Sequence, residues 1–241
     1  MLDPDFPYRL LQAGQQRTVK AIQSLSAEYS TRGLTYNTDR FAAISGLENR
    51  IARAKRCEAR FGIFQTCLHR SLLWQKSGES SMDRIEYKTQ IVPSWSWMAY
   101  DGQIQFMDVP FHEVYWVRSL RFNKRYKYRW LKKTWKCALV TVISFFQNCS
   151  LEQRGASYAI LDSGNTERGW IQYDIEVNAR LDAKECVVLG RQQISESDVR
   201  KWEYYILVVR LTDVDNEYER VGVGCIQSDY VRRHGSEALI V

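Results

Sequence analysis

The sequence predicts an α+β fold in which N-terminal helices pack on a mainly antiparallel β-sandwich or barrel. The first third of the chain places apolar residues at helical spacing, whereas from Ile85 onward short β-rich runs alternate with turn residues. No stretch rich in proline, glycine and serine separates the two parts. We therefore expect a helical subdomain over residues 1–80 and a β-rich subdomain over residues 81–241, joined as one continuous folding unit.

Two amphipathic helices are expected in the first third. Their apolar residues recur at steps of three or four, first as Val19, Ile22, Leu25 and Tyr29, then as Phe41, Ile44, Leu47, Ile51 and Ala54. Gly33 separates the two series, and Asn37 or Thr38 is suited to cap the second helix.

The turn between these helices contains two residues of opposite charge. We expect Arg32 and Asp39 to form a partly buried, hydrogen-bonded pair that fixes this turn. A small polar site that includes both side chains is the alternative. Further along, the mixed stretch from Phe64 to Trp74 is predicted as a short helix or as a helix that runs into a strand, and the periodicity leaves both open.

A tryptophan pair marks the first expected hairpin. Pro93 begins the segment, Trp95 and Trp97 alternate with serines, and Asp101-Gly102 follows as a turn. Alternation at period two predicts a strand over 94–100 with both indoles on one face, turned back toward residues 103–106. We expect the two indoles to pack in the core; a ligand-stacking platform is the alternative.

Ten strands are predicted in the second part of the chain. They are expected at 85–91, 94–100, 103–107, 114–122, 137–146, 157–161, 170–175, 185–191, 204–211 and 218–226. The clearest pair is 204–211 with 218–226, and the first of these is nearly continuous in apolar residues, as a strand buried on both faces would be.

Composition excludes several classes of protein. Hydrophobic residues are 45% and no run approaches the roughly 20 apolar residues that span a bilayer, so neither disorder nor a membrane span is expected. The start of the chain lacks the pattern of a secretory signal, and the six cysteines form no paired motif, which predicts an intracellular, cytoplasmic chain with reduced thiols. The scattered cysteines and three histidines predict no metal site, and no cofactor motif is present.

No catalytic constellation is visible. His69-Arg70 has no accompanying nucleophile motif and is expected to be structural, and Gly222-Val223-Gly224 lacks the third glycine of a dinucleotide-binding loop. The acids Asp213, Asp215, Glu217 and Glu219 are crowded into a hairpin turn, where they serve solubility or turn geometry; a weak calcium site is the alternative. The sequence therefore predicts a protein that is not an enzyme.

The excess positive charge is concentrated in one stretch. Residues 118–136 hold nine Lys or Arg and no acid, interleaved with aromatic residues; subtracting nine from the net charge of +6 leaves −3 for the remainder. Such a stretch could contact nucleic acid or an anionic surface, or be a solvated strand and loop. The candidate contacts are Arg121, Lys124, Arg125, Lys127, Arg129, Lys132 and Lys133.

A set of motifs in fixed order carries a family resemblance. In chain order they are Glu28-Tyr29-Ser30-Thr31-Arg32-Gly33-Leu34-Thr35-Tyr36-Asn37-Thr38-Asp39-Arg40, Ala43-Ile44-Ser45-Gly46-Leu47, Leu72-Leu73-Trp74-Gln75, Val92-Pro93-Ser94-Trp95-Ser96-Trp97, Asp101-Gly102 and Tyr218-Glu219-Arg220-Val221-Gly222-Val223-Gly224. Together they resemble the region downstream of the HET domain in fungal heterokaryon incompatibility proteins. The resemblance spans residues 25–106 and 202–226, and residues 110–200 carry no matching motif.

The resemblance implies a non-catalytic accessory region that acts in non-self recognition through protein contacts. The HET domain itself has no counterpart here, so its activities do not carry over, and the chain resembles a truncated product or a stand-alone remnant that begins where the post-HET region would. We expect a structural role for Arg32, Asp39, Trp74, Pro93, Trp95, Trp97, Asp101, Gly102, Arg220 and Gly222. The identity of the protein partner and the oligomeric state are left open.

Overall fold

The computed structural model describes residues 6–78, 82–88, 91–123, 137–175, 185–194 and 201–241. The described α-helices all lie in the first third of the chain. They are α1 (Tyr8–Gln12), α2 (Gln15–Ser30), α3 (Arg40–Lys55) and α4 (Leu68–Leu72). The strands are β1 (Ala59–Arg60), β2 (Ile63–Phe64), β3 (Trp74–Lys76), β4 (Asp83–Arg84), β5 (Tyr100–Asp101), β6 (Ile104–Phe106), β7 (Val114–Trp116), β8 (Arg121–Asn123), β9 (Ala138–Phe146), β10 (Ser150–Arg154), β11 (Ser157–Leu161), β12 (Glu167–Tyr173), β13 (Glu185–Gln193), β14 (Trp202–Leu211), β15 (Glu217–Gln227) and β16 (Val231–Ile240).

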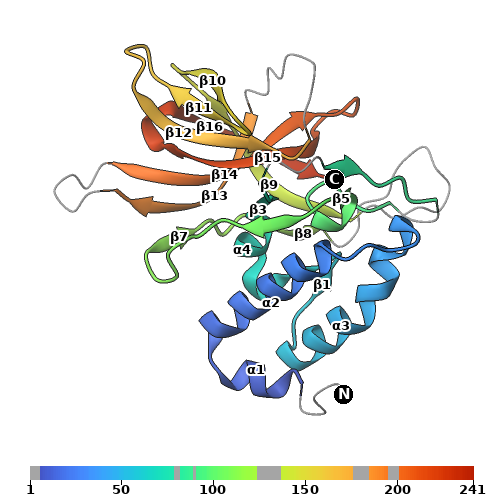
Figure 1. Cartoon of the computed structure of the whole chain (residues 1–241). Coiled ribbons are helices and arrows are strands. Elements are labelled where there is room, and N and C mark those ends of the chain that lie inside the picture. The colour runs from blue at the N-terminus through green and yellow to red at the C-terminus, as the bar shows by residue number, and fades with distance from the viewer. Residues whose placement is uncertain (1–5, 79–81, 89–90, 124–136, 176–184, 195–200) are drawn as a thin grey trace.

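One ten-stranded sheet dominates the fold (Figure 1). Its strands follow the order β10-β11-β12-β15-β14-β13-β9-β16, with β7 paired to β13 and β8 paired to β9. All of these neighbours are antiparallel, and one additional parallel pairing joins β15 to β16. That pairing closes β15, β14, β13, β9 and β16 into a ring, from which β12, β11 and β10 extend. The predicted class, an α+β fold with N-terminal helices and a mainly antiparallel β-rich part, is confirmed.

The strand pair β14–β15 lies at the centre of this sheet. The predicted pairing of 204–211 with 218–226 is present, and its antiparallel register matches Tyr204 with Ile226 and Leu211 with Tyr218. Along β14, Tyr205, Leu207 and Val209 face one apolar cluster, whereas Tyr204, Ile206 and Val208 face another. The continuous apolar run of β14 therefore reflects burial on both faces of the sheet.

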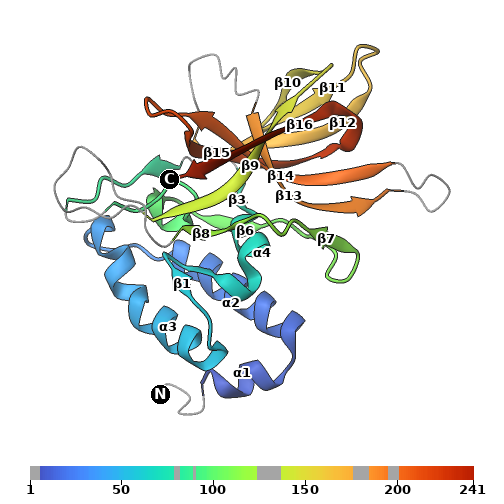
Figure 2. The ribbon, with the colours of Figure 1, turned by 180° about the vertical axis from the view of Figure 1, so that it is seen from behind.

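The helices lie together on one side of the sheet, and this arrangement is visible from front and back (Figures 1 and 2). Val19 and Ile22 of α2 pack against Ile51 of α3 in a small cluster of their own. The larger cluster extends from Ile44 of α3 to Ile240 of β16, so helical and β-rich parts share one core.

The two long helices agree with the predicted series, but the start of α3 differs. A 3-10 turn over Asn37–Asp39 precedes α3, and no side chain caps the helix. The Asn37 side chain donates instead to Asp101 at 2.5 Å. Further on, α4 runs into β3 across Leu73, which is one of the two alternatives that the sequence left open.

The predicted hairpin around the tryptophans is wrong. Trp97–Ala99 form a 3-10 turn, because the Ser96 hydroxyl accepts a hydrogen bond from the Met98 amide at 3.0 Å and so stabilises a tight turn. Gly102 does turn the chain, with a φ of 141° that favours glycine. The flanking strands do not pair with each other, however, since β5 pairs with β4 and β6 pairs with β3.

Other strand predictions were partly correct. The expected strand at 85–91 is absent from its described residues, and the expected strand at 114–122 is divided into β7 and β8. The sequence reading missed α1, β10 and β16. Polar residues dominate β10, and β16 carries Arg232, Arg233 and Glu237, so neither strand shows the apolar pattern used to detect strands.

Candidate functional site

Arg220 of β15 lies at the centre of the motif residues. Its side chain is 1% exposed. Nε and Nη2 each donate to the Asp174 carboxylate at 3.0 Å, and the guanidinium also donates to the carbonyls of Leu72 at 2.7 Å and Trp74 at 2.5 Å. The guanidinium carbon lies 3.4 Å from the centroid of the Trp74 ring. Hydrogen bonds, a paired charge and a cation–π contact together compensate for the burial of this cation.

The serine of the Pro93-Ser94-Trp95 motif contacts the same residue. The backbone N–H of Arg220 donates to the Ser94 hydroxyl at 2.8 Å, and that hydroxyl donates to the carbonyl of Val241. The indole N–H of Trp74 donates to the carbonyl of Trp95 at 3.0 Å. We call Leu72, Trp74, Ser94, Asp174 and Arg220 the Arg220 cluster. It joins α4, β3 and β15 to Ser94 in the tryptophan segment and to Asp174, which follows β12.

A second buried arginine, Arg40, holds the turn between the helices and β5. Arg40 is 2% exposed and donates to the carbonyl of Tyr100 at 3.0 Å and to the Asp101 carboxylate at 3.2 Å. The predicted pair of Arg32 with Asp39 is wrong: Arg32 forms an exposed ion pair with Glu28 at 2.8 Å, one helical turn earlier. The partner of the buried cation at this turn is therefore Asp101, which the sequence had placed only in a turn.

Both motif tryptophans are completely buried. Trp95 packs edge-on against Phe61 with ring centroids 6.2 Å apart, and Trp97 packs edge-on against Tyr29 at 6.1 Å. The prediction that they fill the core is confirmed, although they do so from a turn rather than from a strand. They do not form a ligand-stacking platform.

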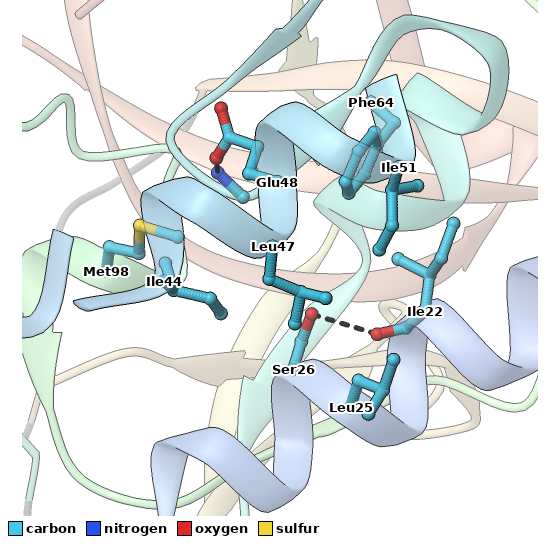
Figure 3. A pocket seen from close by; sticks show the side chains of 10 residues that line it. Ile22, Leu25, Ser26, Ile44, Leu47, Glu48, Ile51, Phe64 and Met98 are labelled. Atoms are coloured by element: carbon cyan, nitrogen blue, oxygen red, sulfur yellow. Dashed lines mark hydrogen bonds between the residues drawn. The ribbon is translucent and has the colours of Figure 1, made fainter. Parts of the chain in front are cut away.

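A small cavity lies between α2 and α3 (Figure 3). Its volume is about 20 Å³ and its walls are mainly apolar, so it has room for about one water molecule. Glu48 turns its carboxylate away from the apolar side chains and accepts a hydrogen bond from the Gly62 amide at 2.6 Å. Burial raises the pKa of Glu48 above its ordinary value, against the smaller effect of that hydrogen bond.

A larger cavity of about 330 Å³ lies beside α4 and contains His69 and Arg70. His69 Nε2 lies 2.7 Å from the Val117 carbonyl and the ring stacks on Trp116, with centroids 5.4 Å apart. Arg70 donates to the carbonyls of three consecutive residues, 109–111. Both side chains therefore brace the loop before and after β7, as predicted for a structural histidine.

The same cavity contains a thiol, Cys67. Burial raises the pKa of this thiol above its ordinary value, despite a 3.3 Å contact with the Ser71 hydroxyl. Burial also lowers the pKa of His69, so the imidazole is neutral at physiological pH. A protonated thiol beside a braced, neutral imidazole is not the ion pair that activates a cysteine nucleophile.

The remaining sequence candidates are structural within the described part of the chain. Gly222 and Gly224 lie in β15, where β12 approaches so closely that a Cβ on Gly222 would lie 2.5 Å from the Gln172 carbonyl oxygen. Glu219 pairs with Arg210 at 2.6 Å and with Arg84 at 3.2 Å. The described residues contain no group of three His, Cys, Asp or Glu side chains that could hold a metal ion. All six cysteines are free.

The basic stretch is described only at its start. Arg121 is exposed and forms an ion pair with Glu237 of β16 at 2.9 Å. The other candidate contacts, Lys124, Arg125, Lys127, Arg129, Lys132 and Lys133, lie outside the described residues.

Comparisons with protein-family models, curated proteins and solved structures found no match to this chain. No described helix is long and apolar enough to cross a membrane. The most strongly organised feature of the described residues is the Arg220 cluster with Arg40. Of these residues the sequence singled out only Trp74 and Arg220; Leu72, Ser94 and Arg40 lie in quoted motifs, and Asp174 lies near the end of the predicted strand 170–175 without any distinctive neighbour. The signal for Arg40 was its place directly before Phe41, which begins the apolar series of α3.

Proposed function

We propose that this chain is a non-catalytic interaction module, equivalent to the region downstream of the HET domain in fungal heterokaryon incompatibility proteins, and that it acts in non-self recognition through protein contacts. The observation that carries the proposal is that the quoted motifs meet in space. Leu72 and Trp74, Ser94 and Trp95, and Arg220 come from three separate motifs and contact one another directly.

The chemistry of these contacts also supports a scaffold rather than an active site. The polar atoms of Arg220 and Ser94 are engaged in hydrogen bonds to backbone carbonyls or to Asp174, and the aromatic rings are buried. Residues engaged in this way hold the fold together, which leaves recognition to side chains on the outer surface.

The test is to sequence the genomic locus and map the 5′ end of its transcript. We expect a HET coding sequence, or its remnant, in frame upstream of the codon for Met1. An intact intergenic region without such a remnant contradicts the proposal. As a second test, the full chain fused downstream of a HET domain should change which strains trigger cell death on fusion, compared with the HET domain alone; an unchanged spectrum of incompatible strains also contradicts it.

A second candidate function follows from the nine cations of residues 118–136, which have no acid among them. A segment of this kind favours contact with nucleic acid or another anionic surface.

A further inference from the structure

Exposed arginines and an exposed tyrosine lie beside a partly buried tryptophan and a buried tyrosine where β7, β13 and β14 run side by side. Arg191 of β13 is directly opposite Tyr115 of β7 and Tyr204 of β14, so the three side chains share one face of the sheet. Trp202 lies two residues before Tyr204 and therefore on the same face. Figure 1 shows this end of β13 and β14 projecting from the rest of the sheet, with β7 alongside. We call Tyr115, Arg191, Trp202, Tyr204 and Arg233 the aromatic–arginine face.

The side chains of this face stack on one another. The guanidinium carbon of Arg191 lies 4.5 Å from the centroid of a Trp202 ring, and that of Arg233 lies 5.6 Å from the centroid of Tyr204. Tyr115 meets Trp202 edge-on, with centroids 5.8 Å apart. Tyr115 is 64% exposed, and Arg191 and Arg233 are also exposed.

The two guanidinium groups lack a carboxylate partner among the described residues, and their recorded contacts are with aromatic rings. Two acids lie near this region, and both are associated with Gln192: Glu113 accepts a hydrogen bond from its side chain, and Glu203 is opposite it in the register of β13 and β14. Gln192 follows Arg191 in β13, so it faces the other side of the sheet. Arginines that stack on rings keep their N–H groups directed outward as hydrogen-bond donors. Among the described residues, the face therefore offers aromatic rings together with positive charge that has no carboxylate partner.

We propose that the aromatic–arginine face binds single-stranded nucleic acid. Bases stack on Tyr115 and Trp202, and phosphates pair with Arg191 and Arg233. Neighbouring strands are about 4.8 Å apart, so aromatic and cationic groups alternate along the face at a short interval that suits a strand of stacked bases. An acidic peptide would use the guanidinium groups but would leave the exposed Tyr115 ring without a role. This inference is independent of the proposed recognition function and rests on residues outside 118–136.

The test is fluorescence anisotropy with labelled oligo-dT and oligo-rU of about 12 nucleotides, titrated with the full chain at about 50 and about 200 mM salt. We expect binding that weakens as salt rises. Tyr115→Ala should weaken it about tenfold, which is the loss of one stacked base. Arg191→Glu and Arg233→Glu should each weaken it by about tenfold or more, and each should lower the salt slope by about 0.7, the value for one phosphate contact on a single strand.

Two matched controls separate this surface from general charge effects. Arg232→Glu makes the same change of charge on the adjacent residue of β16, which is exposed and stacks on Phe145 rather than on Tyr204. Tyr36→Ala removes another exposed tyrosine, one that is 67% exposed and lies before α3. Both controls should change the affinity less than about twofold. Circular dichroism would check folding, and Arg191→Gln replaces Arg191→Glu if the reversal disturbs the sheet.

Four outcomes would overturn the proposal. The first is that no binding is detected at low salt, and the second is that Arg191→Glu and Arg232→Glu weaken binding equally. The third is that binding is lost only when Lys124, Arg125 and Lys127 are reversed. The fourth is that the chain prefers a phosphotyrosine or polyglutamate peptide to the oligonucleotides.

Discussion

Arg220 shows what a buried charge requires in this protein. Removing a cation from water costs several kcal/mol, and an ion pair recovers that cost only when its geometry and hydrogen bonds are good. Asp174 accepts two hydrogen bonds from the guanidinium, and two backbone carbonyls accept others. The pair thus fixes the relative positions of β15, β3 and the end of α4, and either partner alone would be an uncompensated charge in the core.

Arg220→Met should therefore destabilise the chain strongly. It leaves the Asp174 carboxylate buried without its partner, and we expect a loss of about 3–5 kcal/mol in the free energy of unfolding, measured by urea denaturation. The matched control is Arg154→Met, which breaks an ion pair with Glu167 in which both side chains are about half exposed. That change should cost less than about 1 kcal/mol. Equal losses in the two variants would show that the Arg220 cluster contributes no special stability.

The raised pKa of Glu48 predicts the direction in which the stability of the protein changes with pH. Burial raises its pKa in the folded state, so the unfolded state releases this proton first as pH increases. Stability contributed by Glu48 is therefore present below its raised pKa and falls as pH rises from the ordinary glutamate value, about 4.3, through the raised one. Glu48→Gln cannot ionise and keeps an acceptor for the Gly62 amide. The difference in free energy of unfolding, Glu48→Gln minus wild type, should rise as pH increases across this window and then stay level.

Asp162 provides a control for which the contribution to stability should change with pH in the opposite direction. The Thr166 amide, Arg168 and the Gly164 amide lower the pKa of Asp162 to about 2. Its contribution is present above the ordinary aspartate value and disappears as pH falls toward 2. Asp162→Asn should thus approach wild-type stability in acid and fall below it near neutrality. Parallel curves for Glu48→Gln and wild type between about pH 4 and about pH 8 would contradict the assignment to Glu48.

Among the elements, those that bury a regular apolar pattern were predictable from sequence. The helices α2 and α3 show steps of three and four, and β14 is apolar on both faces because Leu207 and Ile206 enter different clusters. The segment around Trp97 has strand-like alternation, yet the hydrogen bond from the Met98 amide to Ser96 stabilises a 3-10 turn. A single side-chain acceptor decided this conformation, and no periodicity reports it.

The contact between β12 and β15 depends on a glycine. A Cβ at Gly222 would meet the Gln172 carbonyl oxygen at 2.5 Å, and that oxygen belongs to backbone that cannot rotate away. Gly222→Ala should destabilise the chain by about 1–3 kcal/mol, as overpacking does, in thermal or urea unfolding. Gly46→Ala is the matched control, since nothing lies within 4 Å of its Cβ position in α3. Alanine there should stabilise the helix by about 0.5–1 kcal/mol, and a similar loss in both variants would contradict the close-approach argument.

The basic stretch supports a further prediction. If residues 118–136 bind nucleic acid, reversing Lys124, Arg125 and Lys127 to Glu together should abolish binding at moderate salt, because three phosphate contacts become repulsive. Fluorescence anisotropy against salt concentration would measure this. The control reverses two arginines outside residues 118–136 to Glu: Arg154, which pairs with Glu167, and Arg168, which pairs with Asp162. Unaltered binding in the triple variant would exclude the stretch as the contact surface.

For the whole molecule, the fold class followed from the sequence but the candidate sites did not. The division into amphipathic helices and short strands is a local pattern, and it predicted the α+β class correctly while leaving sandwich and barrel open. The Arg220 cluster combines residues 72, 94, 174 and 220, which no local pattern connects. The pairing of Arg40 with Asp101 likewise joins two motifs that are separated by three others in the sequence. Long-range partners of buried charges are set by the completed fold.

Closure of the ring has a consequence for biosynthesis. β16 comes after every other ring strand in the chain, and it pairs with both β9 and β15. Until β16 has been synthesised, the edge of β9 that it covers lacks its final partner and is exposed to other nascent chains. Cellular yield should therefore depend on how quickly β16 emerges and pairs, and a chaperone that shields strand edges during elongation would raise it.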